Sequence, residues 1–514
     1  MKEQQESLPG VPAPRAGEWT TEQESGEPRL KRVDRRQLVM RAMDVDKLVA
    51  EDDPVRAIWE FVGQLDLSRY TEQVRSVSGV AGRPALDPQV LVSLWVYSYS
   101  RGESSARAIA RQCDYEPGYQ WLTGMEPVSA HTLSDFRVAH AESLRDLFVQ
   151  TLGLLSEQGL ITLERVMQDG TKVRANASGS SFRTKNRVEA FLEQAREAVE
   201  ELESKSEEES SLQMQAARRR AEREKRQRLS RALEQYEKLE AAKSRIKHAS
   251  TTDPDARFMK HAEGNSAPSY NVQVTTDAEH SVIVDIEATQ AGSDYRQLKP
   301  AMDRVEQNLA RTPKQVVVDG GYISNENISA MAKRGVELIG PDPETKKRSQ
   351  ANRKKSYSHR SVSPEYEGSN FVYDAATNTY ICPEGKRLRY EAKYERSGAM
   401  HYRYMASKQD CHSCPAKSQC CPRTRGGRAV ERIGPSADVA QFRQRMATDE
   451  AKAIYRTRSQ IAEFPNLWIK SKFGIRQFNV RGLAKVRTES LWAALTYDIM
   501  QWIRLCWRPA LVPP

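Results

Sequence analysis

The sequence has no segment that would direct the protein into or through a membrane. Residues 1–17 contain Glu, Gln, Pro and Ser without an apolar run, so we expect no signal peptide. No stretch of the chain approaches about 18 uninterrupted apolar residues, the minimum for a membrane-spanning helix. We therefore expect a soluble cytoplasmic protein with no membrane partner.

Histidine is scarce and cysteine is confined largely to one region. Only 8 of the 514 residues are histidine, and none lies at ligand spacing with the acidic residues described below. This argues against a histidine-rich metal centre and against a Ser-His-Asp hydrolase. Of the 7 cysteines, five lie between Cys382 and Cys421. In a reducing cytoplasm such a cluster favours metal binding over disulfides.

The bulk composition describes a basic, polar protein with a folded core. The length favours two or three domains with attached segments. Hydrophobic residues make up 39% of the chain, too many for disorder throughout. The net charge is +10 and the pI is about 9.1. Such an excess of Lys and Arg favours a phosphate-rich partner, because binding releases the counterions of a nucleic acid.

The first part of the chain is predicted to be helical after a disordered leader. Residues 1–36 are rich in Glu, Pro, Gly and Arg without periodicity, which is typical of disorder. Within residues 37–155, Leu86, Val90 and Leu94 recur at helical spacing, and Pro88 suits the start of the helix. This pattern predicts a helix with one apolar face.

Two more helices are expected in this region. The segments SSARAIARQC from Ser104 and VSAHTLSDFRVAH from Val128 each contain an early serine that can cap a helix. Short helices joined by tight turns are typical of a helix-turn-helix, whose later helix enters a DNA groove. A small helical bundle that only packs is the alternative. If the later helix reads DNA, its exposed readers are His131, Thr132, Ser134 and Arg137.

Residues 156–187 and 251–340 are predicted to form one mixed α/β sheet. RVMQDGTKVRANAS reads as a strand that leaves a core and turns. YNVQVTTD, HSVIVDIEATQ and KQVVVDGGY read as further strands, with QLKPAMDRVEQNLA as a helix among them. Strands that alternate with helices in this way imply an α/β core.

Insertions are predicted on either side of the second part of that core. Residues 188–250 are mostly charged residues, Ala, Gln and Leu, which predicts a long solvated helical hairpin or coiled coil. Its arginines either contact a phosphate backbone or form a solvated face. Residues 341–435 combine an exposed basic loop, TKKRSQANRKKSYSHR, with the cysteine segment. Residues 436–508 are expected to be helical, and residues 509–514 form a tail.

Three acidic residues form the candidate catalytic group. Asp169 ends the strand-like run VMQ, and Asp319 ends VVV and precedes two glycines. Ligands of α/β sheets collect at such strand ends. Glu463 lies in the helical stretch IYRTRSQIAEFPNLWIK. Two strand-end aspartates and a helix glutamate are hard oxygen ligands that suit Mg²⁺ or Mn²⁺ and in-line phosphoryl transfer.

The segments that carry these acids resemble a known family. QDGTKVRANAS, VVVDGGYIS and YRTRSQIAEFPNLWIK are similar to the three blocks of bacterial DDE transposases in the insertion-sequence group numbered eleven-eighty-two. The resemblance covers roughly residues 40–505. It implies an RNase H-like catalytic core, a helical amino-terminal domain, and Asp169, Asp319 and Glu463 as the catalytic triad.

The same resemblance assigns DNA contacts around the glutamate. Tyr455, Arg458 and Lys470 match the family's Tyr, Arg and Lys, although related transposases place three residues between Arg and Glu where this chain has four. On a regular helix Lys470 lies about two turns after Glu463, on the same face. The basic stretch that follows adds Lys472 and Arg476 to the expected DNA contacts.

The cysteine segment is a candidate zinc site. Cys411 and Cys414 form a C-x2-C pair, with Cys382 upstream and Cys420 downstream. Four thiolates with one such pair are compatible with one structural Zn²⁺. A ribbon signature would have a second close pair, and Cys421, His401 and His412 are rival ligands. Reduced cysteines in an inserted loop remain the alternative.

The sequence therefore predicts a metal-dependent DNA transposase of the bacterial cytoplasm and nucleoid. Its partners would be the terminal inverted repeats of a transposon and target DNA, bound by a homodimer. One alternative is a non-catalytic DNA-binding protein derived from a transposase, which would not need all three acids. The other is a metal-dependent DNA nuclease without strand transfer, which would use the same acids.

Overall fold

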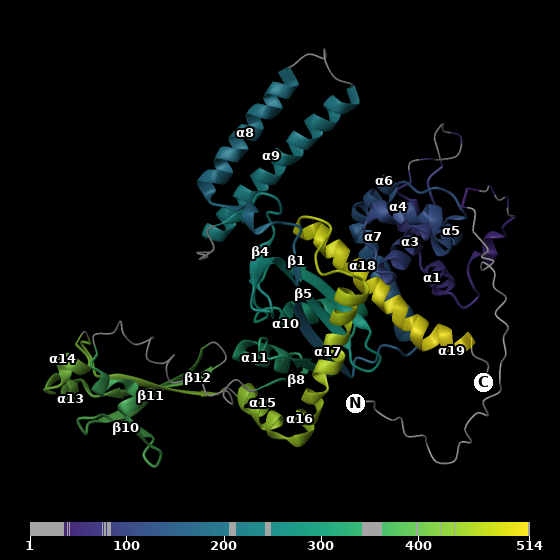
Figure 1. The fold of residues 1–514 in the computed structure, drawn as a ribbon. Coiled ribbons are helices and arrows are strands. Elements are labelled where there is room, and N and C mark those ends of the chain that lie inside the picture. Colours follow the sequence, from purple (N-terminus) through teal and green to yellow (C-terminus); the bar gives the residue numbers. More distant parts are fainter. Residues whose placement is uncertain are drawn as a thin grey trace, which may run out of the picture. The chain divides into compact units, whose positions relative to one another are not determined.

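A computed structural model describes residues 35–511 except 37, 39, 41, 75, 77–78, 80–83, 205–211, 242–247, 342–361, 397–398, 423 and 436. The chain divides into two units, Met1–Asp44 and Val45–Pro514, and every described helix and strand belongs to the second (Figure 1). The leader predicted for residues 1–36 lies outside the described residues except for Arg35 and Arg36.

The amino-terminal part of the second unit is helical, as predicted. Asp87 and Ser129 cap their helices by accepting hydrogen bonds from the backbone N–H groups of Gln89 (2.8 Å) and Thr132 (3.0 Å). Three of these helices were expected individually; α5, which begins at Pro117 after the capping carboxylate of Glu116, is among those that were not. The elements are η1 (Val45–Leu48), α1 (Pro54–Gly63), α2 (Ser68–Thr71), α3 (Pro88–Ser100), α4 (Ala106–Tyr115), α5 (Pro117–Thr123), α6 (Ala130–Ala139) and α7 (Ala141–Glu157).

A six-stranded mixed sheet forms the centre of the unit. The strands follow the order β4-β5-β1-β7-β8, and β6 also pairs with β5. β1 is antiparallel to β5 but parallel to β7, and β7 is parallel to β8. The predicted α/β core is therefore confirmed. The strands are β1 (Arg165–Arg174), β4 (Arg257–Lys260), β5 (Ser266–Asp277), β6 (Ile283–Thr289), β7 (Gln315–Val318) and β8 (Glu337–Ile339), with α10 (Leu298–Leu309) and α11 (Asn325–Lys333) between them.

The carboxy-terminal part is helical, with short breaks at Thr448 and Thr457 and a longer one at residues 473–482. Residues 436–508 were expected to be helical, but residues 473–482 are not, because Gly474 (φ 69°) and Gly482 (φ 87°) adopt left-handed backbone that ends regular helix. α18 then runs through the core and contacts β6, α7 and α3. The elements are α15 (Ala437–Ala447), α16 (Asp449–Arg456), α17 (Arg458–Leu467), the π-helix η5 (Trp468–Lys472), α18 (Leu483–Trp502), the π-helix η6 (Ile503–Trp507) and α19 (Arg508–Leu511).

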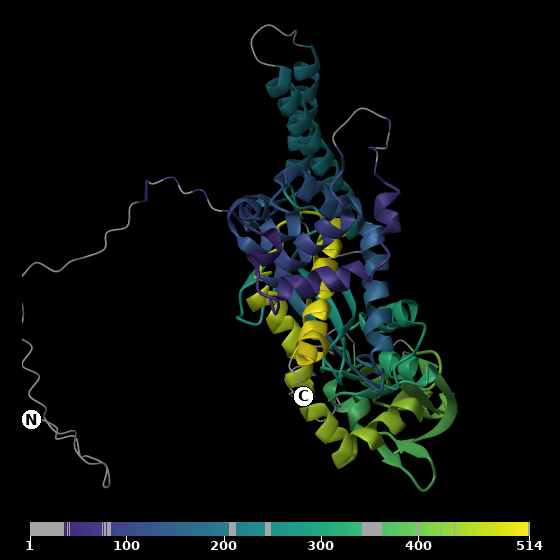
Figure 2. The same ribbon diagram turned by 90° about the vertical axis from the view of Figure 1, so that its right-hand side faces the viewer.

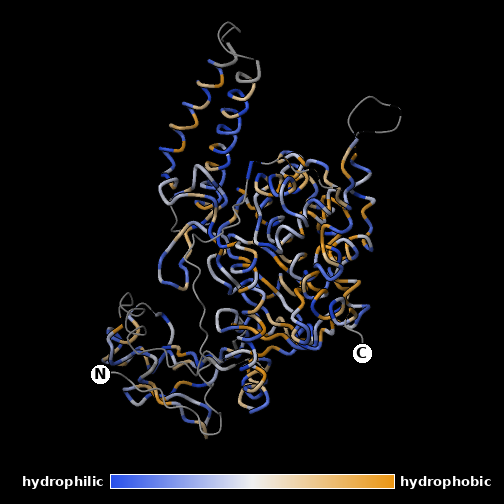
Figure 3. Tube along the Cα trace, turned by 45° about the vertical axis from the view of Figure 1, so that its right-hand side comes forward, coloured by the Kyte–Doolittle hydropathy of each residue, from blue (hydrophilic) through white to orange (hydrophobic). Residues whose placement is uncertain are grey.

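The charged segment forms the predicted helical hairpin. α8 (Lys185–Ser204) and α9 (Leu212–Ala241) lie side by side in both views (Figures 1 and 2). The hairpin is mostly hydrophilic, and its apolar contacts gather around Val188, Leu192 and Leu229 (Figure 3). At its base lie η2 (Gly179–Ser181) and the paired strands β2 (Phe182–Arg183) and β3 (Ala249–Ser250).

The cysteine-bearing insertion is a five-stranded antiparallel sheet, whose strands the sequence analysis did not predict. Leu388, Tyr404 and Val430 are buried in its own small core. The basic loop predicted at residues 345–360 lies outside the described residues. The elements are η3 (Pro364–Tyr366), η4 (Gly368–Asn370), β9 (Val372–Asp374), β10 (Thr379–Ile381), β11 (Arg387–Arg396), β12 (Ala399–Ala406), α13 (Lys408–His412), α14 (Lys417–Cys420) and β13 (Ala429–Pro435).

Among the described helices, none combines the length and the apolar character needed to cross a lipid bilayer.

Candidate active site

Asp169 and Asp319 lie next to each other at one edge of the parallel strand pair. The parallel register between β1 and β7 ends with Gln168 opposite Val318, so the next residue on each strand is an aspartate. The Asp319 carboxylate accepts a hydrogen bond from the backbone N–H of Gly321 at 2.7 Å. Each aspartate is thus the first residue after the parallel pairing of β1 with β7.

The prediction that β1 ends at Asp169 is wrong. The strand continues to Arg174, because residues 169–174 keep their antiparallel pairing with β5 after the parallel pairing with β7 has stopped. Asp169 therefore lies within the strand, opposite Val274. Its side chain is only 16% exposed instead of lying at an open edge.

Two side chains of α17 hold the Asp169 carboxylate. Arg458 forms an ion pair with Oδ1 at 2.8 Å, and the Asn466 amide donates to Oδ2 at 3.0 Å. Arg458, Ala462 and Asn466 are spaced by four residues, so they share one face of the helix. α17 is thus anchored on β1 by polar contacts to a single carboxylate.

The environment of Asp169 disfavours its ionised form. Burial raises the pKa of Asp169 to about 6; the Arg458 charge opposes this rise, whereas the carboxylates of Asp319 and Asp294 add to it. Because Asp319 and Asp294 both act on the same group, negative charge is concentrated at this edge of the sheet. A site of this kind favours a cation.

Asp294 is an acidic residue of this site that the sequence analysis missed. It lies in the loop between β6 and α10, and its Oδ1 accepts hydrogen bonds from the amides of Asn271 and Gln273, both at 2.7 Å. A Cβ atom on Gly170 would lie 2.5 Å from Asp294 Oδ1, and one on Gly321 would lie 3.7 Å from Oδ2. Gly170, beside Asp169, therefore leaves room for a third carboxylate, which also lies close to Gly321.

Glu463 lies on α17, the helix that contacts Asp169, but it does not face the aspartates. It is exposed on α17, and it is five residues after Arg458, so it is turned by about 140° around the helix axis from Arg458. In the part of the chain that the structure describes, no three His, Cys, Asp or Glu side chains are grouped closely enough to hold a metal ion. Glu463 thus flanks the site.

Tyr455 and Lys470 both lie close to the carboxylates, but they belong to different helices. Tyr455, on α16, packs against the apolar cluster of Met167 and Val317. Lys470 is half-buried; burial lowers its pKa, and the charge of Asp169 opposes this shift. Lys470 belongs to the π-helix η5, so the regular α-helix on which its predicted phase relied does not continue to this residue.

Of the other predicted contacts with DNA, Thr132 is exposed, as predicted, whereas Ser134 is half-buried. Lys472 lies over the Trp468 ring, and Arg476 and His131 are exposed. Arg137, however, was expected to be exposed and is only 8% exposed. Leu133, Phe136 and Arg137 all point into the core of the helical region.

Arg137 has a buried environment of its own. Its Nη1 donates to the backbone oxygen of Ser104 at 2.8 Å, and the guanidinium lies 4.8 Å from the centroid of the Trp95 ring. The carboxylate of Glu489 is nearby and 1% exposed; burial raises the pKa of Glu489, and the charge of Arg137 opposes that shift. Arg137 thus joins α6 to α3 and to the backbone just before α4.

The predicted zinc ligands share one small cavity. Cys382, Cys411, Cys414 and Cys420 line it together with Cys421. Backbone N–H groups point at two of these sulfurs: that of Lys386 lies 3.2 Å from Cys382 Sγ, and that of Arg428 lies 3.2 Å from Cys411 Sγ. All seven cysteines are free thiols.

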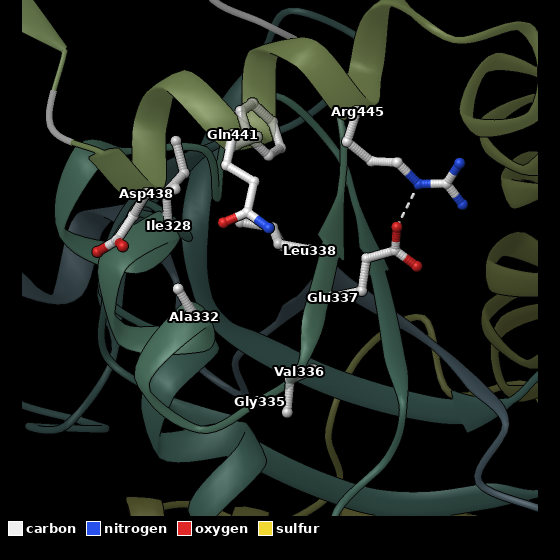
Figure 4. A pocket seen from close by; sticks show the side chains of 10 residues that line it. Ile328, Ala332, Gly335, Val336, Glu337, Leu338, Asp438, Gln441 and Arg445 are labelled. Atoms are coloured by element: carbon white, nitrogen blue, oxygen red, sulfur yellow. Dashed lines mark hydrogen bonds and ion pairs between the residues drawn. The ribbon is translucent and has the colours of Figure 1, made fainter.

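A separate pocket of about 340 Å³ lies between α11, β8 and α15 (Figure 4). Ile328, Leu338 and Phe442 supply apolar lining, and Arg445 forms an ion pair with Glu337 at its rim. None of the predicted site residues lines this pocket.

Comparison with known proteins gives matches at both ends of the described chain. A family model described as a transposase domain (DUF772) matches residues 43–139, which is the helical region. A model described as a transposase DDE domain matches residues 381–503, which include Glu463 but neither Asp169 nor Asp319. No curated protein matches the chain.

One solved structure is similar at a low level. It is the cryo-EM structure of a piggyBac transposase synaptic complex with hairpin DNA, with 9% identity and a TM-score of 0.24 over 91% of this chain and 81% of that chain. A likeness this weak carries no argument about the site. The chain is therefore similar to transposases over these two regions, residues 43–139 and 381–503.

Proposed function

We propose that this protein is a DDE transposase that binds the ends of its insertion sequence and cuts and rejoins DNA at Asp169, Asp319 and Glu463 with divalent metal ions. The observation that carries the proposal is the parallel register of β1 and β7, which ends one residue before both aspartates. The strand order, with β1 antiparallel to β5 and parallel to β7, supports an RNase H-like core. Glu463 is proposed as the third acid because it matches the family's final block.

The residues at this edge suit Mg²⁺ or Mn²⁺ by their chemistry. Asp169 and Asp319 supply hard oxygen ligands, and the buried amide oxygen of Asn466 has no hydrogen-bond partner among the described residues. When bound, such ions activate an attacking hydroxyl and stabilise the leaving oxygen in a phosphoryl transfer. The proposal requires the exposed Glu463 side chain to turn toward the aspartates.

Basic residues beside Asp169 are proposed to hold the DNA backbone. The pKa of His261 is lowered by burial and by the charges of Arg174, Lys470 and Lys172. These three cations therefore lie near the same imidazole. Lys172 and Arg174 follow Asp169 on the same strand, β1. Phosphates held there would present the next part of the strand to the carboxylates. Arg458 would supply a bidentate contact when it leaves Asp169.

The division between binding and catalysis is tested with Asp319→Asn. This change keeps the shape of the side chain but removes a carboxylate charge, so binding to the element's ends should stay nearly intact while Mg²⁺-dependent cleavage is lost. Cleavage at the wild-type rate would exclude the assignment of the acids. A strand-transfer assay with pre-cut ends separates a transposase from a metal-dependent nuclease, because a nuclease gives no joined product.

We also propose one structural Zn²⁺ per chain at Cys382, Cys411, Cys414 and Cys420. The shared cavity and the two N–H groups that point at sulfur support it, although the described thiols are not yet grouped as a ligand set. Elemental analysis should find about one zinc per chain, and Cys411→Ser with Cys414→Ser should remove it and lower the melting temperature. Protein purified without chelator that contains no zinc would refute the site.

A further inference from the structure

We propose that Asp294 is a fixed carboxylate of the divalent-cation site, and that two buried amides of β5 hold it in place. The inference rests on the proposed function, because it concerns the same site. It adds to that function a residue that lies outside the three family blocks, in the loop before α10.

A chain of buried polar side chains ends at this carboxylate. The Thr275 hydroxyl donates to Gln168 Oε1, and Gln168 Nε2 donates to Gln273 Oε1 at 2.9 Å. Tyr322 donates to the same Gln273 oxygen at 2.6 Å, and Gln273 Nε2 donates to Asp294 Oδ1 at 2.7 Å. Because both glutamines are fully buried, these bonds fix the amide that faces Asp294.

The strand beside Asp294 is shaped to accept its carboxylate. A side chain on Gly170 would place Cβ 2.5 Å from Asp294 Oδ1 and 2.6 Å from Gln273 Nε2, so only glycine leaves this space open. A residue that served merely to cap a loop would not need the strand next to Asp169 to lack a side chain. Gly170 thus brings Asp294 against the backbone of β1.

Two buried oxygens at the site have no hydrogen-bond partner among the described residues. They are Asn271 Oδ1, in a residue 1% exposed whose Nδ2 binds Asp294, and Asn466 Oδ1, in a residue 8% exposed whose Nδ2 binds Asp169. Leaving a buried acceptor unsatisfied costs about 1–3 kcal/mol. Both oxygens therefore call for a ligand that interacts with acceptors, such as a hydrated cation.

The arrangement gives the aspartates different tasks. Arg458 and Asn466 hold Asp169, so Asp169 must change partners when a cation binds. Asp294 is held only by neutral amide donors, which leave its full negative charge in place. It therefore attracts the cation to a fixed position toward which Asp169 and Asp319 turn.

The test is Mn²⁺ binding by the full chain without DNA, followed by the electron paramagnetic resonance signal of free Mn²⁺. Asp294→Asn keeps an acceptor for both amides but removes the charge, so affinity should fall by roughly tenfold or more, as it should for Asp319→Asn. Asp449→Asn is the matched control, because Asp449 is fully exposed on α16, and it should bind as the wild type does.

A glycine pair tests the same point without touching an acid. Gly170→Ala should weaken Mn²⁺ binding by displacing Asp294, whereas Gly292→Ala should not, because nothing lies within 4 Å of its added Cβ. Wild-type affinity in Asp294→Asn together with weak binding in Asp319→Asn would overturn this inference and leave the proposed function standing. Wild-type affinity in Asp319→Asn would instead remove the proposed metal centre itself. If Asp294→Asn does not fold, the result for Gly170→Ala decides.

Discussion

Replacing Arg137 by alanine should destabilise the protein instead of altering how it reads DNA. The guanidinium is 8% exposed, bonds to Ser104 O and lies on the Trp95 ring. Its loss removes a charged hydrogen bond worth about 1.5–3 kcal/mol and a cation–π contact worth up to about 2 kcal/mol. It also leaves Glu489 buried without its positive neighbour.

These contributions overlap, so we expect a total loss of about 2–4 kcal/mol in the free energy of unfolding, from the hydrogen bond to Ser104 and the contact with Trp95. Urea unfolding followed by tryptophan fluorescence measures it, because Trp95 and Trp492 are buried in the same core and their rings lie 6.3 Å apart. Adding Glu489→Gln to Arg137→Ala should restore part of the stability, since the unpaired charge is then gone.

His131→Ala is the matched control. His131 is exposed on the same helix, so its unfolding free energy should change by no more than about 0.5 kcal/mol. If Arg137→Ala unfolds like the wild type and loses only its discrimination between the element's ends and random DNA, the buried role is wrong and Arg137 reads DNA.

Two further predictions concern Lys470 and Asp498. Lys470→Ala should weaken binding to all DNA sequences and lower the slope of log binding constant against log salt concentration by about one unit. His131→Ala should lower only the discrimination between the element's ends and random DNA. A changed sequence preference in Lys470→Ala would contradict this division. Asp498 is fully buried on α18, accepts a bond from Ile283 N at 2.8 Å, and has its pKa raised by burial. Because the folded pKa lies above the unfolded one, unfolding free energy should fall as pH rises above about 4. Asp498→Asn should lose this dependence between pH 5 and 8, and an unchanged slope in melting temperature would count against it.

The aspartates on β1 and β7 were predictable because strand periodicity is local and the carboxyl ends of parallel strands share an edge. The continuation of β1 was not, since it depends on pairing with β5, more than ninety residues later in the chain. Asp294 was missed for the same reason: its role comes from Gly170 and Gln273 across the sheet.

Some misses had a signal in the sequence. Leu133, Phe136 and Arg137 are spaced three and four residues apart, which places Arg137 on the apolar face of its helix. The alternation of Leu388, Tyr390 and Ala392 likewise favours a strand in the cysteine-bearing insertion. Arg137 was nevertheless predicted to be exposed, because charged side chains are so seldom buried.

The spacing between Arg458 and Glu463 has a consequence for how α17 works. In related transposases three residues separate the arginine from the glutamate. With that spacing the two side chains would be about 40° apart around the helix axis and would face one target. In this chain Glu463 follows Arg458 by five positions, so it is about 140° from Arg458 and about 60° from Asn466 around the helix axis, away from the side chains that hold Asp169. A regular helix would then carry Lys470 near Glu463, but η5 changes the phase before that point, while the charge of Asp169 still acts on Lys470. The extra residue therefore turns Glu463 away from the aspartates, whereas Lys470, on the π-helix, stays within reach of the Asp169 charge.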